Sequence, residues 1–425
     1  MIHRQLPESP EIDLRNSPLV LLAFISVIAF QLTVIKSIWH IELLARIINT
    51  VILIWASVYF IYSIFFNKFN KNIWLYFLLP GVLVFFGYFV NLAYNITLNL
   101  NLLNQLGLLL PWVVYLTVPQ LMKSKILNSE NLWRYYYNFM IVVLMLGVVE
   151  HFLLLSDLIG SNKIVTAGGP FEANWFSIHF AVDDGSVYDR FYSCFPEPGT
   201  LAMYIIPALS YAFFRRKYFG LFLLGGALYL TQSLGGYISL GILIAIALYL
   251  QIRLWRVNLY VAFAILFCGV SFLYVTFSND LVVAYEQKGN SRLVRESSTL
   301  NFLYELPNLL VNNPRGSELT EDSESRNLNQ HYFGSNFALG NAFMVGGILS
   351  LIGYVAILLV SIGCSIKVLL RRSIPIEERI AFSSIISILP FLFQRSVVWD
   401  SAIFAFLFAP SIIRLLQSRR IFGSA

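Results

Sequence analysis

Charged residues are scarce in this sequence. Asp, Glu, Lys and Arg make up 12% of the 425 residues, hydrophobic residues make up 58%, and the mean hydropathy is +0.70. Soluble domains carry about 25% charged residues, so the composition excludes an ordinary cytosolic enzyme. The stretches 72–122 and 218–252 contain no charged residue at all. Because roughly 20 apolar residues cross a hydrocarbon core about 30 Å thick, the sequence predicts an all-α fold, that of a polytopic integral membrane protein.

Cysteine and the common metal and nucleotide motifs are also rare or missing. The three cysteines, Cys194, Cys268 and Cys364, form no disulfide framework. There is no CxxC, HExxH or Walker-type glycine loop, so a metalloprotease and an ATP-driven pump have no support. The first apolar run, 18–35, is too long for a signal peptide and lacks a small-residue cleavage site, which predicts an uncleaved first span.

Twelve apolar segments have the length of membrane spans. The run 218–250 would be about 50 Å long as one helix, so it must break, and Ser233-Leu234-Gly235-Gly236 supplies a turn. We therefore predict one membrane domain, 1–425, whose twelve spans lie at 18–35, 46–66, 73–94, 101–122, 137–156, 199–214, 218–231, 235–251, 257–279, 336–362, 381–394 and 401–415.

The basic residues orient these predicted spans. With the N-terminus in the cytoplasm, every short basic cluster falls on the inner side, as the positive-inside rule requires, and the C-terminus is cytoplasmic too. This topology accounts for the pI of about 9.1, so no nucleic-acid partner is expected. Two long external loops, 157–198 and 280–335, hold most of the outer polar residues. Transporters usually have short loops and a mid-membrane site, so this arrangement favours chemistry at the outer surface.

The first external loop ends with a carboxylate between two prolines. Pro196 and Pro198 flank Glu197 and bias the backbone away from helix, which predicts a rigidly held carboxylate at the start of a span. The alternative is that the prolines only stop the preceding segment and leave Glu197 solvated.

The second external loop contains a predicted interfacial helix. Leu300, Leu303 and Tyr304 share helical spacing, which favours an amphipathic helix on the membrane surface. Arg292 and Arg295 precede them, and His331 lies just before the next span, where a packing role at the interface is the simpler interpretation.

Three segments together resemble a known family. They are the Arg-Phe to Glu-Pro segment 190–198, the Thr-x-Ser-x-Gly-Gly turn 231–236, and a late external loop with an Asn-Pro-x-Gly turn, 313–316, followed by a glycine-rich span, 336–353. In this order the sequence resembles the Wzy-type O-antigen and capsular polysaccharide polymerases, relatives of the O-antigen ligases. The resemblance covers roughly residues 185–360.

Two positions depart from the family pattern. Many relatives have Arg after the Ser of the short turn, where this chain has Leu234, and many have His directly before the final Asn, where this chain has Ser335. His331 lies four residues before Ser335, so the role of the family's histidine does not pass to it by position.

The resemblance implies an enzyme of the outer face of the bacterial inner membrane. Its substrate would be an oligosaccharide repeat unit linked to undecaprenyl diphosphate, and the growing chain would move onto the next lipid-linked unit. No nucleotide sugar, metal ion or other cofactor is implied. A chain-length regulator protein and membrane lipid are the implied partners.

The chemistry would need cations for the departing diphosphate and a base for the acceptor hydroxyl. Arginine binds phosphate oxygens bidentately and stays charged. The candidates, all on the predicted outer side, are Arg190, Arg292 and Arg295, with Arg315 behind them and Arg395 as a further contact. Pairing with acidic residues of the loops or with lipid phosphates is the alternative role.

For the base, the more rigid Glu197 is favoured over His331. Two other functions stay open. An O-antigen ligase would use the same kind of site, whereas a lipid-linked oligosaccharide flippase would need internal symmetry and charges along the middle of the membrane.

Overall fold

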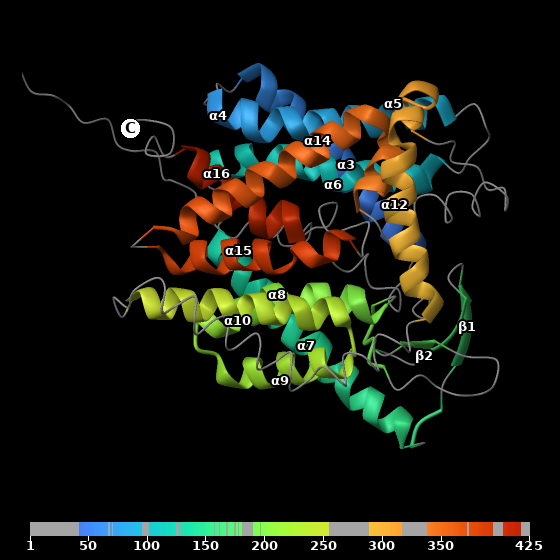
Figure 1. Ribbon diagram of the computed structural model, residues 1–425, viewed down its shortest axis with the longest axis vertical. Helices are drawn as coiled ribbons and strands as arrows, with labels where there is room; N and C mark the ends of the chain where they lie inside the picture. Colours follow the sequence, from blue (N-terminus) through green and yellow to red (C-terminus); the bar gives the residue numbers. More distant parts are fainter. Residues whose placement is uncertain are drawn as a thin grey trace, which may run out of the picture.

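The computed structural model describes residues 42–66, 69, 71–95, 102–124, 127, 129–156, 158–160, 162–166, 169–173, 176, 178–180, 190–195, 197–254, 289–316, 338–371, 374–393 and 403–417. Most of these residues are helical, and most of the long helices run roughly side by side (Figure 1). Three helices are long and apolar enough to cross a membrane: Lys71–Tyr94, Ser129–Leu155 and Ala338–Leu369. The predicted apolar helical fold is confirmed at this level.

The predicted spans coincide with observed helices wherever the chain is described. The spans predicted at 18–35 and 257–279 lie outside the described residues, and the other ten each overlap a helix or a run of consecutive helices. The number of membrane crossings stays a prediction. The helices of the first half are α3 (Glu42–Phe66), α4 (Lys71–Ile73), η2 (Trp74–Leu78), α5 (Leu79–Asn95), α6 (Leu102–Lys123) and α7 (Ser129–Leu155).

The second half of the described chain also consists of helices. Its helices are α8 (Pro198–Phe214), α9 (Tyr218–Leu230), α10 (Leu234–Leu254), α12 (Gly289–Asn312), α14 (Ala338–Leu369), α15 (Ile376–Ser387), η4 (Leu389–Phe393), η5 (Ile403–Phe408) and α16 (Ala409–Gln417). The π-helical segments η2 and η5 each end two residues before a proline, Pro80 and Pro410. Proline has no backbone N–H to donate and its ring crowds the preceding turn, and a widened turn accommodates both effects.

A small antiparallel sheet lies in the first predicted external loop, where we had predicted no strands. β1 (Asn162–Thr166) pairs with β2 (Gly169–Ala173), and β2 pairs with β3 (Ile178–Phe180). The register places Ile164 opposite Phe171, and Phe171 opposite Phe180. The loop is therefore partly ordered by its own strand pairing.

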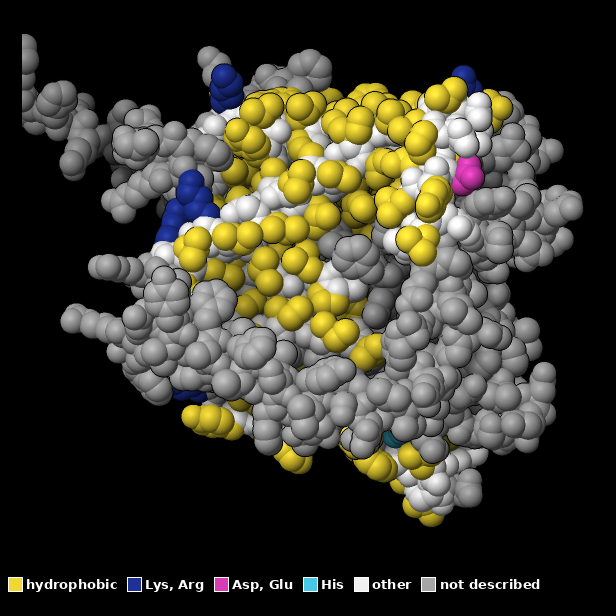
Figure 2. Space-filling view, in the orientation of Figure 1, with side chains coloured by type: hydrophobic (Ala, Val, Ile, Leu, Met, Phe, Trp, Pro, Cys, Tyr) yellow, Lys and Arg dark blue, Asp and Glu magenta, His cyan; other side chains and the backbone are white. Residues whose placement is uncertain are grey.

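The two ends of the helical bundle differ in composition. At one end, which we call the loop end, Figure 1 shows β1, β2 and the crosswise helix α12. At the other, the basic end, Arg215 Nη2 lies 2.7 Å from Glu130 Oε1 and 2.7 Å from Glu377 Oε1, joining the termini of α7, α8 and α15. In Figure 2 most visible Lys and Arg side chains lie away from α12, and hydrophobic side chains cover the upper part of the face between the ends.

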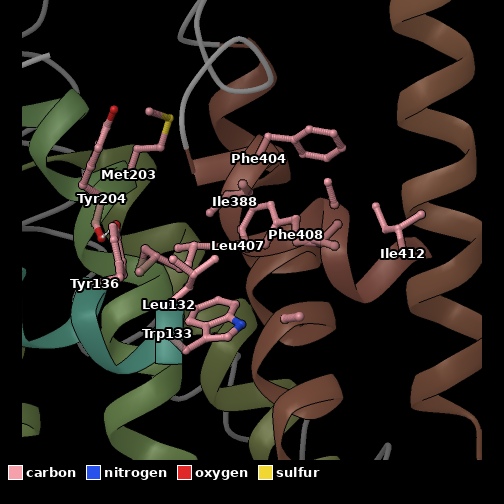
Figure 3. Close-up of a cluster of buried hydrophobic side chains, with 14 of the residues drawn as sticks. Leu132, Trp133, Tyr136, Met203, Tyr204, Ile388, Phe404, Leu407, Phe408 and Ile412 are labelled. Atoms are coloured by element: carbon pink, nitrogen blue, oxygen red, sulfur yellow. Dashed lines mark hydrogen bonds between the residues drawn. The ribbon is translucent and has the colours of Figure 1, made fainter. Parts of the chain in front are cut away.

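Aromatic packing joins the two halves of the chain in the interior. Trp133 of α7 packs on Phe408 of η5, with ring centroids 6.1 Å apart, in the cluster shown in Figure 3. The Tyr136 hydroxyl donates a hydrogen bond of 2.6 Å to the carbonyl oxygen of Tyr204 in α8. This core holds α7, α8 and η5 in fixed positions and so supports the segments at the loop end.

Candidate functional site at the loop end

The first two family-like segments are in direct contact. The backbone N–H of Phe191 donates to the carbonyl of Leu230 at 2.9 Å. Arg190 Nε donates to the carbonyl of Thr231 at 3.2 Å, and its Nη2 donates to that of Gln232 at 3.3 Å. These carbonyls lie at the C-terminal end of α9, where the helix dipole favours a cation. Arg190, a residue predicted to bind diphosphate, is therefore fixed on the α9–α10 turn, and it stays half-exposed.

The segment beneath Arg190 is packed without spare room. The Phe191 ring is fully buried, and its centroid lies 5.2 Å from that of His151 in α7. A Cβ atom added at Gly147 would lie only 2.4 Å from Ser193 Oγ. Burial raises the pKa of the Cys194 thiol to about 12, so this cysteine stays protonated at neutral pH and is no nucleophile. The segment therefore acts as a fixed support.

Glu197 stands at the start of α8, as its flanking prolines led us to expect. Its backbone is extended, with φ −151° and ψ 147°, and Pro198 occupies the first helical position. The Glu197 carbonyl accepts a hydrogen bond of 3.1 Å from the N–H of Leu201, whereas its carboxylate does not cap the helix. The extended backbone before α8 thus places the half-buried carboxylate at the loop end.

The α9–α10 turn is built from short side chains that bond to their own backbone. Thr231 Oγ1 donates to the carbonyl of Leu228 at 2.7 Å and accepts from the N–H of Ser233 at 3.2 Å. Ser233 Oγ accepts from the N–H of Gly236 at 3.3 Å, which caps α10. A Cβ at Gly236 would lie 2.9 Å from Ala202 Cβ, so the glycine lets α10 approach α8 closely.

The second predicted external loop contains α12, which crosses the loop end (Figure 1). Phe302 is buried against Phe343 of α14, with ring centroids 6.1 Å apart. The predicted amphipathic residues face outward instead: Leu300, Leu303 and Tyr304 are 58%, 56% and 84% exposed. α12 therefore presents one apolar side to the protein and a second apolar side to its surroundings.

A turn after α12 is inserted into a break in α14. At Gly347, φ is 64° and ψ is −158°, which interrupts the helix. The N–H of Ile348 donates to the carbonyl of Pro314 at 2.9 Å, and Asn91 Nδ2 of α5 donates to the carbonyl of Val345 at 2.8 Å. The backbone groups released by the break thus find partners on two other segments. This contact fixes α12 on α14.

The remaining predicted site residues are distributed as follows. Arg315 is exposed in the inserted turn, with its guanidinium carbon 5.0 Å from the ring centroid of Tyr94. Arg292 and Arg295 lie in the first half of α12. His331 and Arg395 lie outside the described residues. Within the part of the chain that is described, no group of His, Cys, Asp and Glu side chains could hold a metal ion.

Two polar residues at this end received no site role from the sequence. Glu150, which is 7% exposed, accepts a hydrogen bond from the N–H of Phe176 and so connects the first predicted external loop to α7. Asn91 holds the break in α14. Both residues could have been noticed in the sequence because they are polar side chains inside apolar runs. Burying a polar side chain in a membrane span costs free energy, so such a residue usually has a partner.

Comparisons of the chain with family models, with curated proteins and with solved structures found no match.

Proposed function

We propose that this protein is a polysaccharide polymerase of the outer face of the bacterial inner membrane. It would transfer a growing glycan from undecaprenyl diphosphate onto the next lipid-linked repeat unit. The observation that carries the proposal is the contact between Arg190 and the 231–232 carbonyls. It joins two segments that the polymerase resemblance singled out separately, at the end of the molecule where both predicted external loops lie.

The proposed reaction is a substitution at an anomeric carbon. A hydroxyl oxygen of the acceptor sugar attacks that carbon, and the bond between the carbon and the diphosphate oxygen breaks. The electron pair leaves with the diphosphate, and the hydroxyl proton passes to a general base. Positive charge near the diphosphate stabilises the charge that develops on the leaving group.

The positions of the described residues fit these two needs. Hydrogen bonds to carbonyls fix the Arg190 guanidinium without removing its charge, so it can hold a diphosphate. Arg292 and Arg295 on α12 would supply further positive charge. Glu197 is assigned as the base, because the extended backbone before α8 fixes its position. The partners would be the lipid-linked repeat unit, membrane lipid and a chain-length regulator.

The test is complementation of a deletion strain, scored from the ladder of surface polysaccharide on a gel. The wild-type gene should restore the ladder, and Glu197→Gln and Arg190→Ala should not, although both proteins reach the membrane. Glu305→Gln is the matched control, since Glu305 is a half-buried carboxylate on α12 whose Oε2 accepts from Asn308 Nδ2 at 3.1 Å. It should restore the ladder fully.

Deletion of the gene separates the competing functions. A core or lipid carrier bearing a single repeat unit supports the polymerase. Long chains that remain on their lipid carrier would indicate a ligase. Lipid-linked units trapped inside the cell, with no surface glycan, would indicate a flippase.

A further inference from the structure

A glutamine occupies a backbone position in the α9–α10 turn that glycine would adopt with less strain. Gln232 has φ 48°, in the left-handed region where a Cβ atom crowds the backbone. Two other non-glycine residues of the described chain have positive φ, Ser193 at 49° and Arg216 at 55°. Strained residues of this kind concentrate at functional sites, so each needs an explanation.

The positive φ angles of Ser193 and Arg216 can each be explained. Ser193 is fully buried and its side chain fills the space left by Gly147. Arg216 lies in the exposed α8–α9 turn at the basic end, where the positive-inside rule accounts for a basic residue. Gln232 is neutral and exposed, and its side-chain amide has no hydrogen-bond partner among the residues that the structure describes. Neither packing nor topology explains why this position has a side chain.

The turn itself does not depend on that side chain. The N–H of Gln232 donates to the carbonyl of Tyr229 at 3.1 Å, and its carbonyl accepts from Arg190 Nη2 at 3.3 Å. The next N–H, that of Ser233, donates to Thr231 Oγ1 at 3.2 Å. Glycine at position 232 would make the same backbone contacts. The hydrogen bonds of the turn therefore do not involve the glutamine amide, although its residue has a strained backbone.

We propose that the Gln232 amide binds hydroxyl groups of the sugar next to the diphosphate in the lipid-linked repeat unit. This inference rests on the proposed function. A primary amide offers one acceptor and two donors in a plane, which match neighbouring hydroxyls of a sugar ring. The Gln232 backbone carbonyl accepts from Arg190, which is assigned to the diphosphate, so the exposed side chain at this position would lie within reach of the first sugar of the chain. The amide contributes to the choice of substrate.

The experiment compares the wild type, Gln232→Gly and Arg216→Gly as full-length proteins in nanodiscs. The probe is the undecaprenyl-diphosphate-linked repeat unit extracted from the deletion strain. Both substitutions remove a side chain from a left-handed turn position, so both should keep or raise the thermal unfolding midpoint. Gln232→Gly should lower kcat/KM about tenfold, as expected when a substrate hydroxyl loses its partner. Arg216→Gly should leave kcat/KM unchanged.

The possible outcomes are distinct. Wild-type kcat/KM in Gln232→Gly overturns the proposal, and so does an equal loss in both variants. A lower unfolding midpoint for Gln232→Gly overturns it as well, because the side chain would then support the turn. If the wild type forms no polymer from the same probe, the proposed function fails first, and this inference fails with it.

Discussion

The two ends of the helical bundle are held together in different ways. At the basic end, Arg215 joins the termini of three helices through carboxylates of Glu130 and Glu377, each 2.7 Å away. At the loop end, Arg190 bonds to backbone carbonyls, and the break in α14 is closed by the carbonyl of Pro314. Ion pairs between side chains tolerate small shifts, whereas backbone contacts fix a segment in one position. The described contacts at the loop end therefore fix backbone segments relative to one another, as the proposed function would require of its site.

The largest expected effect comes from breaking the backbone contact between α12 and α14. A Cβ at Gly347 would lie 2.3 Å from the carbonyl oxygen of Pro314, at a φ of 64°. Left-handed strain and overpacking each cost about 1–3 kcal/mol, so Gly347→Ala should destabilise the protein by about 3 kcal/mol. Thermal unfolding of the solubilised chain should show a midpoint lower by several degrees.

The control for this prediction lies in the same helix. Among the described residues, no atom outside the helix's own nearby backbone lies within 4 Å of a Cβ added at Gly363, so alanine there should only improve helix propensity. Gly363→Ala should therefore keep or slightly raise the midpoint. Equal midpoints for Gly347→Ala and the wild type would show that the inserted turn is not held as described.

A smaller effect is expected at the basic end. Arg215→Ala should cost about 1 kcal/mol, because partly exposed ion pairs contribute little. In double-mutant cycles, the coupling of Arg215 to Glu377, which is 25% exposed, should exceed its coupling to Glu130, which is 57% exposed. Both couplings should shrink at 1 M salt, and polymer formation should be unchanged. A coupling that does not respond to salt would contradict this account.

The smallest effect concerns pH. Burial raises the pKa of the Glu378 carboxyl above its ordinary value of 4.5. The folded protein therefore binds this proton more tightly than the unfolded chain, and stability falls as the pH rises through the raised pKa. Glu378→Gln removes this cost, so it should raise the unfolding midpoint slightly at pH 8. The difference should vanish well below pH 4.5, and a difference that persists there would implicate another interaction.

Hydropathy was sufficient to predict most of the helices. Apolar runs are local signals, so they predicted most of the described helices. The break in the run 218–250 was predicted at 233–236, whereas it lies at 231–233 and Leu234 to Gly236 form the first turn of α10. The prolines around Glu197 likewise predicted the start of α8. These features depend on residues that are close together in the chain.

The contacts between distant segments could not be predicted in this way. Gly347 is one of several glycines in an apolar run, and only the approach of Pro314 shows why it must be glycine. Asn91 and Arg190 bond to carbonyl oxygens, which every residue has, so no sequence pattern marks their partners. The left-handed backbone conformation of Gln232 could not be predicted from the sequence either, because glutamine has no preference for that conformation.

The break in α14 also indicates how deep the loop end lies in a membrane. From position 348 to 369 the helix rises roughly 33 Å at 1.5 Å per residue, close to the thickness of a hydrocarbon core of about 30 Å. If the segment 348–369 of α14 spans that core, Gly347 lies at the boundary between the core and the lipid headgroups. The end of α12 that is bound to α14 near Gly347 then lies at the same depth. The diphosphate of a lipid-linked substrate cannot enter the hydrocarbon, and its tail cannot leave it. The proposed enzyme and its proposed substrate would therefore meet within one thin layer, in which the substrate diffuses in two dimensions.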